Sequence, residues 1–284
     1  MPQPSPAELD RWLVTARDAA DAAARVHRSW SGRLDILGAD SKGFSDFVSR
    51  VDLESQEAAL GVIRERHPGH RILAEEGDES EAVPDDGEPL WVVDPLDGTT
   101  NFLHGHPNHA ASVAVAVDGR PVAACVHASA TSERWLARAG GGAWRNGRPI
   151  RVSAHRGWEQ SLVSTGFTFK GGNDLERFAR ELAAVRRAGA GIRRCGAAAI
   201  DLCYVADGRY EGFWEGFLSP WDYAAGWLVA LEAGGVATRL DGAPLGLEPG
   251  SLLVANHPKT HRDLHRLVES AKRARGQLAP DPLA

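Results

Sequence analysis

The chain has 284 residues, with 32 Lys and Arg against 38 Asp and Glu, a formal net charge of −6 and a pI of about 6.0. This acidic balance argues against nucleic acid as the main ligand, because proteins that bind it usually carry a basic stripe or patch. A chain of this length buries roughly 75% of its unfolded surface, enough for a rigid active site. We expect one domain over residues 1–284, with a core over about 5–275 and a flexible tail at 276–284.

The cysteine and histidine spacings favour neither a disulfide framework nor a zinc site. The residues concerned are Cys125, Cys195, Cys203, His104, His106 and His109. We interpret the three histidines as surface or supporting residues, and a reducing cytoplasm is the expected location. The start of the chain lacks a basic segment followed by an apolar run, and no run of eighteen apolar residues occurs. We therefore expect no membrane association.

The first third of the chain alternates helical and strand patterns. Ser5-Pro6-Ala7-Glu8 is a capping box with proline in the first turn, and it opens a long amphipathic helix. A second helix is expected over about 52–66. Strands are expected at 71–74 and 90–93, and an acidic loop at 77–88 separates them.

The remaining two thirds begin with hairpins and then alternate again. Segments 111–117 and 122–128 flank Asp118-Gly119, a strong two-residue hairpin signal, and a second hairpin is expected at Asn146-Gly147. Helices are expected around 175–185, 197–205, 222–233 and 264–271, and strands at 210–214 and 251–255. This order predicts mixed α/β layers rather than a helical bundle or a β-sandwich.

One segment carries most of the chemistry: Asp94-Pro95-Leu96-Asp97-Gly98-Thr99-Thr100-Asn101-Phe102. It puts two carboxylates three residues apart, followed by a glycine and two hydroxyls. Because a buried strand precedes it, Asp94 is expected at the strand's carboxyl end, where open α/β structures place their ligands. Alone, Asp97-Gly98 is most simply a turn, since four other Asp-Gly pairs occur in the chain.

Six acidic residues stand at the ends of expected elements: Asp52, Glu75, Glu76, Asp94, Asp97 and Asp222. If several converged within about 4 to 5 Å, each pair would repel by about 3 to 4 kcal/mol at an effective dielectric near 20. Bound cations would make such a cluster tolerable, and oxygen-only ligation suits Mg²⁺. Gly98 and Thr99 would then offer backbone amides to phosphate oxygens. The alternatives are helix N-caps at Asp52 and Asp222 and a solvated Glu75-Glu76 pair.

Residues 91–102 resemble the first signature of the inositol monophosphatase family. Trp221-Asp222-Tyr223-Ala224-Ala225-Gly226 with Glu232-Ala233-Gly234-Gly235 looks like its second signature. The resemblance extends from the first helix to Asn256-His257-Pro258. It implies an α+β fold, the layered αβαβα sandwich of the inositol monophosphatase and fructose-1,6-bisphosphatase type. It also implies a homodimer, for which the antiparallel segment 111–128 is one candidate interface.

The resemblance implies a magnesium site at five positions. Glu75, Asp94 and the backbone carbonyl of Leu96 match the ligands of a first Mg²⁺. Asp94, Asp97 and Asp222 match those of a second ion. Glu75 would also hold a weaker third ion, and Mn²⁺ is a possible substitute.

The resemblance also implies how water is activated. In the family, the attacking water lies on the metal and is hydrogen-bonded through residues that match Thr99 and Asp52. These two residues are the expected activating pair, and Glu76 is expected to support the water network. No covalent phospho-enzyme is then needed.

The expected substrate contacts are Asp97, Gly98, Thr99, Arg193, Gly196, Ala198, Glu215 and Asp222. Glu215 would accept hydrogen bonds from ring hydroxyls, and the alternative is an exposed glutamate at a strand end. Segment 40–46 resembles the family's mobile loop only loosely, so the assignment of Lys42 to the water shell of a third ion stays open.

The substrate expected from the resemblance is a small phosphate monoester. Thr100-Asn101-Phe102 looks like the inositol branch, whereas relatives that cleave histidinol phosphate or adenosine bisphosphates often carry lysine at the position of Thr100. We expect hydrolysis of inositol 1-phosphate or a similar cyclitol or sugar phosphate, with inhibition by lithium. Histidinol-phosphate phosphatase and then fructose-1,6-bisphosphatase are the alternatives, and a regulatory binding protein is the non-enzymatic one.

Overall fold

The computed structural model of the chain describes residues 4–33, 39–43, 46–76, 87–155, 157–167 and 175–273. The helices are α1 (Pro6–Trp30), α2 (Arg50–Arg66), α3 (Thr99–Leu103), α4 (Leu175–Arg187), α5 (Ala198–Ala206), α6 (Pro220–Glu232) and α7 (Pro258–Arg273). The expected tail, the acidic loop over 77–86 and the side chain of Lys42 lie outside this description.

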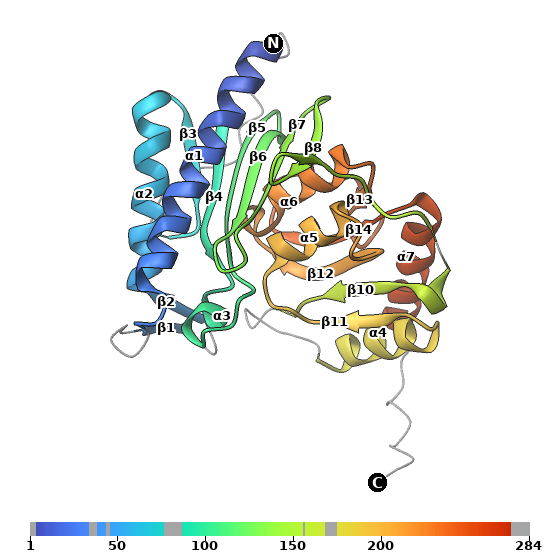
Figure 1. Ribbon diagram of the computed structural model, residues 1–284. Coiled ribbons are helices and arrows are strands. Elements are labelled where there is room, and N and C mark those ends of the chain that lie inside the picture. The colour runs from blue at the N-terminus through green and yellow to red at the C-terminus, as the bar shows by residue number, and fades with distance from the viewer. Residues whose placement is uncertain are drawn as a thin grey trace.

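Two large sheets organise the fold (Figure 1). The first has seven strands in the order β3 (Arg71–Ala74), β4 (Leu90–Asp97), β5 (Ala110–Val117), β6 (Arg120–Ala128), β7 (Glu133–Arg138), β8 (Gly142–Arg145) and β9 (Arg148–Pro149). The second has five strands in the order β11 (Gly191–Arg193), β10 (Leu162–Thr165), β12 (Gly212–Leu218), β14 (Gly250–Ala255) and β13 (Val236–Thr238). A separate pair joins β1 (Ala39–Gly43) to β2 (Asp46–Ser49).

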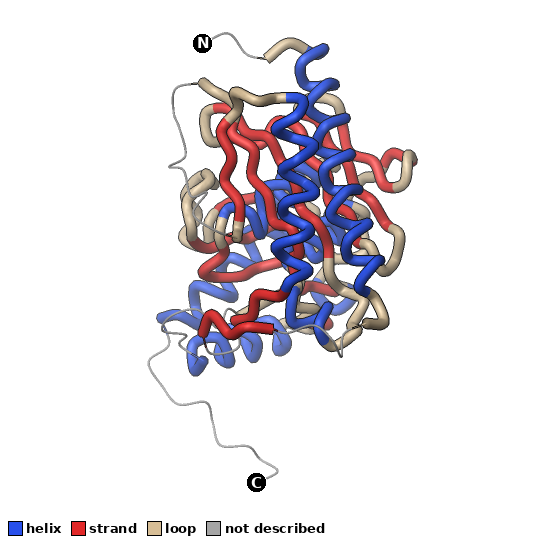
Figure 2. The backbone as a smooth tube through the Cα atoms, turned by 90° about the vertical axis from the view of Figure 1, so that its left-hand side faces the viewer, coloured by secondary structure: helices blue, strands red, loops and turns tan. Residues whose placement is uncertain are grey.

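The helices form three layers around these sheets. Figure 2 shows α1 and α2 side by side in front of the strands of the first sheet. Helices α5 and α6 lie between the two sheets, and α4 and α7 cover the far face of the second sheet (Figure 1). Each junction between layers holds its own cluster of buried apolar side chains. The layers therefore alternate αβαβα, and the expected architecture is confirmed.

The burial of β4 follows from this layering. All eight of its residues are buried, because α1 and α2 cover one face of the sheet and α6 covers the other. Apolar residues such as Trp91 and Val93 match that environment. The carboxylates at the end of the strand are therefore buried in the same apolar interior.

Several local expectations are confirmed at the level of caps and turns. Ser5 and Glu8 form the reciprocal capping box that opens α1. Asp118 and Gly119 join β5 to β6 with φ angles of 50° and 68°. Positive φ at both central residues is the type I′ geometry that suits a two-residue hairpin.

Other expectations need correction. Helix α2 begins at Arg50, so Asp52 lies in its first turn rather than at its N-cap. Helix α6 begins at Pro220 after the N-cap Ser219, because proline is well suited to the first helical position. Strand β12 continues to Leu218, so Glu215 lies within the strand and not at its end.

The segment named as one candidate dimer interface is largely covered within this chain, and its role in a dimer stays a prediction. Strands β5 and β6 lie in the middle of the seven-stranded sheet and are covered by α1 on one face and α6 on the other. Ala111, Val113 and Ala123 have no exposed surface. The exposed residues of this segment are Asp118 and Arg120, in and beside the β5–β6 turn. Among the helices of the described residues, none combines the length and the apolar character that crossing a membrane requires.

Candidate active site

The site is built on the turn that ends β4. The pairing of β4 with β5 shifts register between Asp94 and Asp97, so the chain bulges out of the ladder at that point. The amide of Leu96 donates a hydrogen bond of 2.9 Å to Oδ1 of Asp94 and fixes the first carboxylate. At Gly98, φ is +87°, and a Cβ would lie 2.8 Å from the carbonyl oxygen of Asn108. Only glycine fits there.

Four carboxylates face one another around this turn. Asp94 is 1% exposed, and its pKa is raised well above its ordinary value, first by burial and then by the charges of Glu75, Asp97 and Asp222. The pKa of Asp97 is also raised, by burial and then by Asp222. An opposing effect comes from the amide of Ala199, which donates a hydrogen bond of 2.8 Å to Oδ2 of Asp97. The structure thus brings together the acidic residues of three separate segments.

The chemistry of this donor set fits a hard divalent cation. The side chains of Glu75 and Asp94 are within hydrogen-bonding contact, which adds to the effects that raise the pKa of Asp94. The described side chains form no ready-made group of three or more His, Cys, Asp or Glu ligands. The oxygen donors nevertheless repel one another strongly, and positive charge between them would relieve that repulsion as Mg²⁺ does in carboxylate sites.

Thr99 and Asp52 form a polar pair beside the acidic residues. Asp52 has no exposed surface and lies in the first turn of α2, while Thr99 is half-buried at the start of α3. The Thr99 hydroxyl donates to Oδ1 of Asp52 at 2.8 Å, and the carbonyl oxygen of Leu96 is 3.2 Å away. A hydroxyl has one proton, and the carboxylate is the nearer and stronger acceptor. The lone pairs of Thr99 are then available to a water.

Hydrogen bonds to the backbone position Glu76 and Asp222. Glu76 is 4% exposed, and Gln56 binds its amide at 3.0 Å and its carbonyl oxygen at 2.5 Å. Asp222 is the third residue of α6, and its Oδ2 accepts a hydrogen bond of 2.7 Å from the amide of Ser219. Asp222 therefore caps its own helix while its charge acts on Asp94 and Asp97.

The expected substrate residues lie on α5, the loop before it and β12. Asn101 joins this loop to the first motif, because its side-chain amide donates to the carbonyl oxygens of Asn108 at 2.7 Å and Cys195 at 2.8 Å. Gly196 follows in the loop, and Ala198 is the first residue of α5. Asn101 belongs to the sequence motif, yet this linking role becomes visible only in the structure.

Arg193, the last residue of β11, and Arg194, which follows it, have different contacts. Arg193 is exposed, and its guanidinium donates to the carbonyl oxygen of its neighbour Ile192 at 3.0 Å. Arg194 lies 4.4 Å from the ring centroid of Phe167 and donates to the Phe167 carbonyl oxygen at 3.3 Å. Its charge lowers the pKa of Glu215, although burial, Asp222 and Asp201 together raise that pKa to about 8. Sequence reasoning selected Arg193 and overlooked Arg194.

His27 is a second residue that sequence reasoning missed. It is 1% exposed near the end of α1, and burial lowers its pKa to about 3, so the ring is neutral. Nε2 is 2.8 Å from the carbonyl oxygen of Pro95 and Nδ1 is 3.2 Å from Oγ of Ser129. A neutral ring satisfies both contacts when Nε2–H donates to Pro95 and Nδ1 accepts from Ser129. His27 thus holds the backbone of the acidic turn.

The layered fold and the buried acidic turn define an α+β protein that concentrates carboxylates at the end of one strand. The chain belongs to the inositol monophosphatase family, whose model matches residues 8–273. A putative Nus factor SuhB from Neisseria meningitidis serogroup B is 40% identical over 263 residues, which cover 92% of this chain and 99% of that protein. The inositol-1-monophosphatase of Rhizobium meliloti is 42% identical over 79% of this chain and 84% of its own length.

Solved structures agree with this family. The crystal structure of the extragenic suppressor protein suhB from Bartonella henselae matches with a TM-score of 0.83 and 36% identity, covering 90% of this chain and 97% of that chain. The family and the fold expected from the sequence are therefore confirmed. Family membership supports phosphatase activity and is generally associated with Mg²⁺, while the names of the relatives differ in what they imply about function.

Proposed function

We propose that this chain is a Mg²⁺-dependent phosphomonoesterase that hydrolyses inositol 1-phosphate, or a similar cyclitol or sugar phosphate, by direct attack of an activated water. The observation that carries the proposal is the buried hydrogen bond from Thr99 to Asp52 beside four mutually repelling carboxylates. The inositol-1-monophosphatase from Rhizobium meliloti, 42% identical, supports the choice of substrate.

The proposed ligands are Glu75, Asp94, the carbonyl of Leu96, Asp97 and Asp222. Mg²⁺ bound there would lower the pKa of a water and neutralise charge on the phosphoryl oxygens. Thr99 orients that water, since its own proton is engaged by Asp52 and its lone pairs accept a hydrogen bond. Asp52 holds the hydroxyl in this orientation and would act as the base: the water's proton passes to Oγ1 of Thr99 as the hydroxyl proton passes to Asp52.

The remaining proposed contacts place the two ends of the substrate. Gly98 and Thr99 offer backbone amides to the phosphate. Glu215 accepts a hydrogen bond from a ring hydroxyl on the other side of the site, near Gly196 and Ala198. A site that hydrogen-bonds a substrate hydroxyl strongly rejects analogues that lack it.

A phosphate-release panel with Mg²⁺ tests the proposal. The substrates are inositol 1-phosphate, histidinol phosphate, fructose 1,6-bisphosphate, adenosine 3′,5′-bisphosphate and NADP. We expect the highest kcat/KM with inositol 1-phosphate and suppression by millimolar lithium. A clear preference for histidinol phosphate, or next for fructose 1,6-bisphosphate, would assign the chain to one of those alternatives.

A second candidate function rests on the names of other relatives. Proteins called Nus factor SuhB are about 40% identical over most of this chain. A regulatory protein that binds transcription factors is therefore the non-enzymatic proposal. Inactivity across the panel together with saturable binding to purified Nus factors would favour it. We also propose a cytoplasmic homodimer, which sedimentation of the purified chain would test.

A further inference from the structure

The end of β10 lies directly against Glu215. Strands β10 and β12 are parallel neighbours in which Thr165 pairs with Trp214. The Thr165 hydroxyl reinforces this register with a hydrogen bond of 2.7 Å to the carbonyl oxygen of Trp214. The next residues along the two strands, Gly166 and Glu215, are therefore opposite each other.

Gly166 leaves the space that the Glu215 carboxylate occupies. A Cβ built on Gly166 would lie 2.1 Å from Oε2, 2.2 Å from Oε1 and 2.2 Å from Cδ of Glu215, far inside the 3.0 Å below which real Cβ atoms are essentially never found. The backbone of Gly166 does not have a positive φ, so the chain conformation itself would accept alanine. A side chain at this position would therefore force the carboxylate of Glu215 to move from its place.

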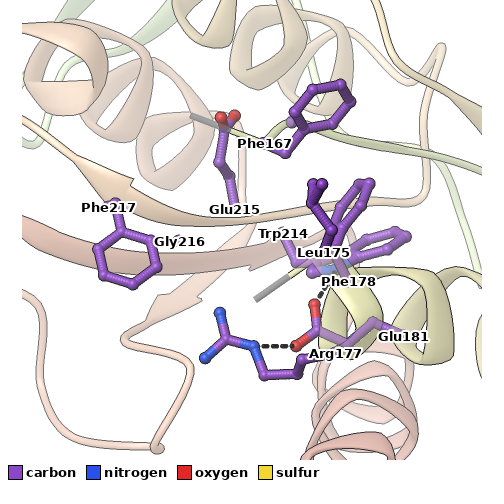
Figure 3. Close-up of a pocket in the computed structure, with 10 residues that line it drawn as sticks. Phe167, Leu175, Arg177, Phe178, Glu181, Trp214, Glu215, Gly216 and Phe217 are labelled. Carbon is purple, nitrogen blue, oxygen red and sulfur yellow. Dashed lines mark hydrogen bonds and ion pairs between the residues drawn. The ribbon is translucent and has the colours of Figure 1, made fainter. Parts of the chain in front are cut away.

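The Glu215 carboxylate lies on the side of β12 that faces Phe167. Figure 3 shows the Glu215 side chain pointing away from the Arg177–Glu181 pair and toward the side of Phe167. Arg194 lies on the ring of Phe167 and contributes the nearby positive charge. A small cavity of about 20 Å³ that Gly166 and Glu215 share with Arg177 and Glu181 lies on the opposite side of the strand, toward α4. The polar group that meets the carboxylate must therefore approach from the side of Phe167 and Arg194.

We propose that Gly166 is a specificity-determining residue: its missing side chain lets the Glu215 carboxylate meet one hydroxyl of a polyol phosphate. The inference rests on the proposed phosphatase function and adds a residue that positions the substrate's alcohol part. Gly166 acts through Glu215 and takes no part in handling the phosphate, which binds at the other end of the site. Changes at Gly166 must therefore affect substrates with ring hydroxyls selectively.

The test compares two substrates in the Gly166→Ala variant. The added methyl must displace the carboxylate by about 1 Å, and a misplacement of that size costs up to about 100-fold in rate. We expect kcat/KM for inositol 1-phosphate to fall by about 10- to 100-fold. With p-nitrophenyl phosphate, which has no ring hydroxyl, it should stay within about threefold because the phosphate contacts are unchanged.

Gly61→Ala is the matched control, since Gly61 has no atom within 4 Å of its built Cβ and no positive φ. A double-mutant cycle then separates positioning from general damage. In a Glu215→Ala background the clash is gone, so adding Gly166→Ala should change neither substrate's kinetics nor Tm further. If Gly166→Ala alone fails to fold, the double variant should fold and match Glu215→Ala in discrimination; its failure to fold would overturn the inference.

The remaining outcomes distinguish a failure of the role assigned to Gly166 from a failure of the proposed function. Equal losses with both substrates in a folded Gly166→Ala variant, unchanged kinetics with inositol 1-phosphate, or additive effects in the cycle would each overturn the role of Gly166 while leaving the proposed function intact. A wild-type chain that releases phosphate from neither substrate would overturn the proposed function and the inference together.

Discussion

The hydroxyl of Thr99 donates a hydrogen bond to Oδ1 of Asp52 across 2.8 Å, and it connects the start of α3 to the first turn of α2. The acceptor has no exposed surface. Because the acidic turn leads directly into α3, the pair joins the expected water-activating groups to the expected metal ligands. Loss of the hydroxyl should therefore affect catalysis and local stability by different amounts.

We predict that Thr99→Val lowers kcat by about 100-fold or more, as expected for a group that orients the attacking water. KM should change little, because valine keeps the shape of threonine. The buried carboxylate loses one charge-assisted hydrogen bond, which costs about 1.5 to 3 kcal/mol of unfolding free energy. Phosphate release and urea denaturation measure the two effects. Thr131→Val, at an exposed position, is the control, and a Thr99→Val enzyme with normal kcat would exclude this residue from water activation.

Asp94→Asn should separate activity from stability. The amide oxygen still accepts the hydrogen bond from Leu96, while the buried charge that Glu75, Asp97 and Asp222 repel is removed. We expect turnover to be abolished and the Tm in chelator to rise above that of the wild type. Mg²⁺ should raise the Tm of the wild type only, since a ligand that binds the folded state stabilises it.

Asp118→Asn serves as the control for Asp94→Asn, because Asp118 is exposed in the β5–β6 turn. It should keep both activity and the response to Mg²⁺. If the Asp94→Asn protein hydrolyses phosphate at a rate comparable to the wild type, the assignment of Asp94 as a shared metal ligand is wrong.

His27 should make the fold sensitive to acid. Burial lowers its pKa from 6.5 to about 3, so the unfolded chain takes up a proton that the folded chain refuses. The stability contributed by the neutral ring is complete above pH 6.5 and is lost as pH falls toward 3, by up to about 1.4 kcal/mol per pH unit. In His27→Gln, whose amide can still donate to Pro95, the unfolding free energy should decline less between about pH 6.5 and 5.

Denaturation in urea with metal chelated measures this slope for the wild type and for His27→Gln. His104→Gln, which removes an exposed histidine, should leave the slope unchanged. The slope should not vanish in His27→Gln, because burial also lowers the pKa of His109. Identical slopes in the wild type and His27→Gln would show that His27 is not held neutral by the fold.

The features that sequence reasoning found are those whose signals are local. Asp94 and Asp97 stand in one short motif after an apolar strand, and Ser5 stands in a capping box. The contact between Thr99 and Asp52 spans 47 residues and was expected only from the family resemblance. The spacing and composition of the sequence do not indicate such a long-range contact.

The features that were missed depend on distant partners. In the sequence, His27 is one more residue of an amphipathic helix. Its contact with Pro95, 68 residues later, is visible only in the fold. Gly166 has an ordinary backbone conformation, and its importance lies in the carboxylate of Glu215. Strands such as β10 and β11 are four and three residues long, too short to show a period.

The neighbouring arginines provide the last prediction. Both arginines are exposed, but Arg194 contacts Phe167 and acts on the charge of Glu215, whereas Arg193 bonds to the adjacent backbone. We expect Arg194→Ala to lower kcat/KM for inositol 1-phosphate by about 3- to 10-fold. This is the size of effect expected when one exposed cation–π contact and one nearby charge are lost. Arg193→Ala should stay within about twofold of the wild type.

The pH profile distinguishes a charge effect of Arg194 from lost packing. The guanidinium lowers the pKa of Glu215, so its removal should raise that pKa further. Because ionised Glu215 is a stronger acceptor for a substrate hydroxyl than the protonated group, the acidic limb of kcat/KM should move to higher pH in Arg194→Ala. An Arg194→Lys variant keeps the charge and should restore the position of the limb without the stacking on Phe167. If kcat/KM fell further in Arg193→Ala than in Arg194→Ala, Arg193 would be the arginine that contacts the substrate.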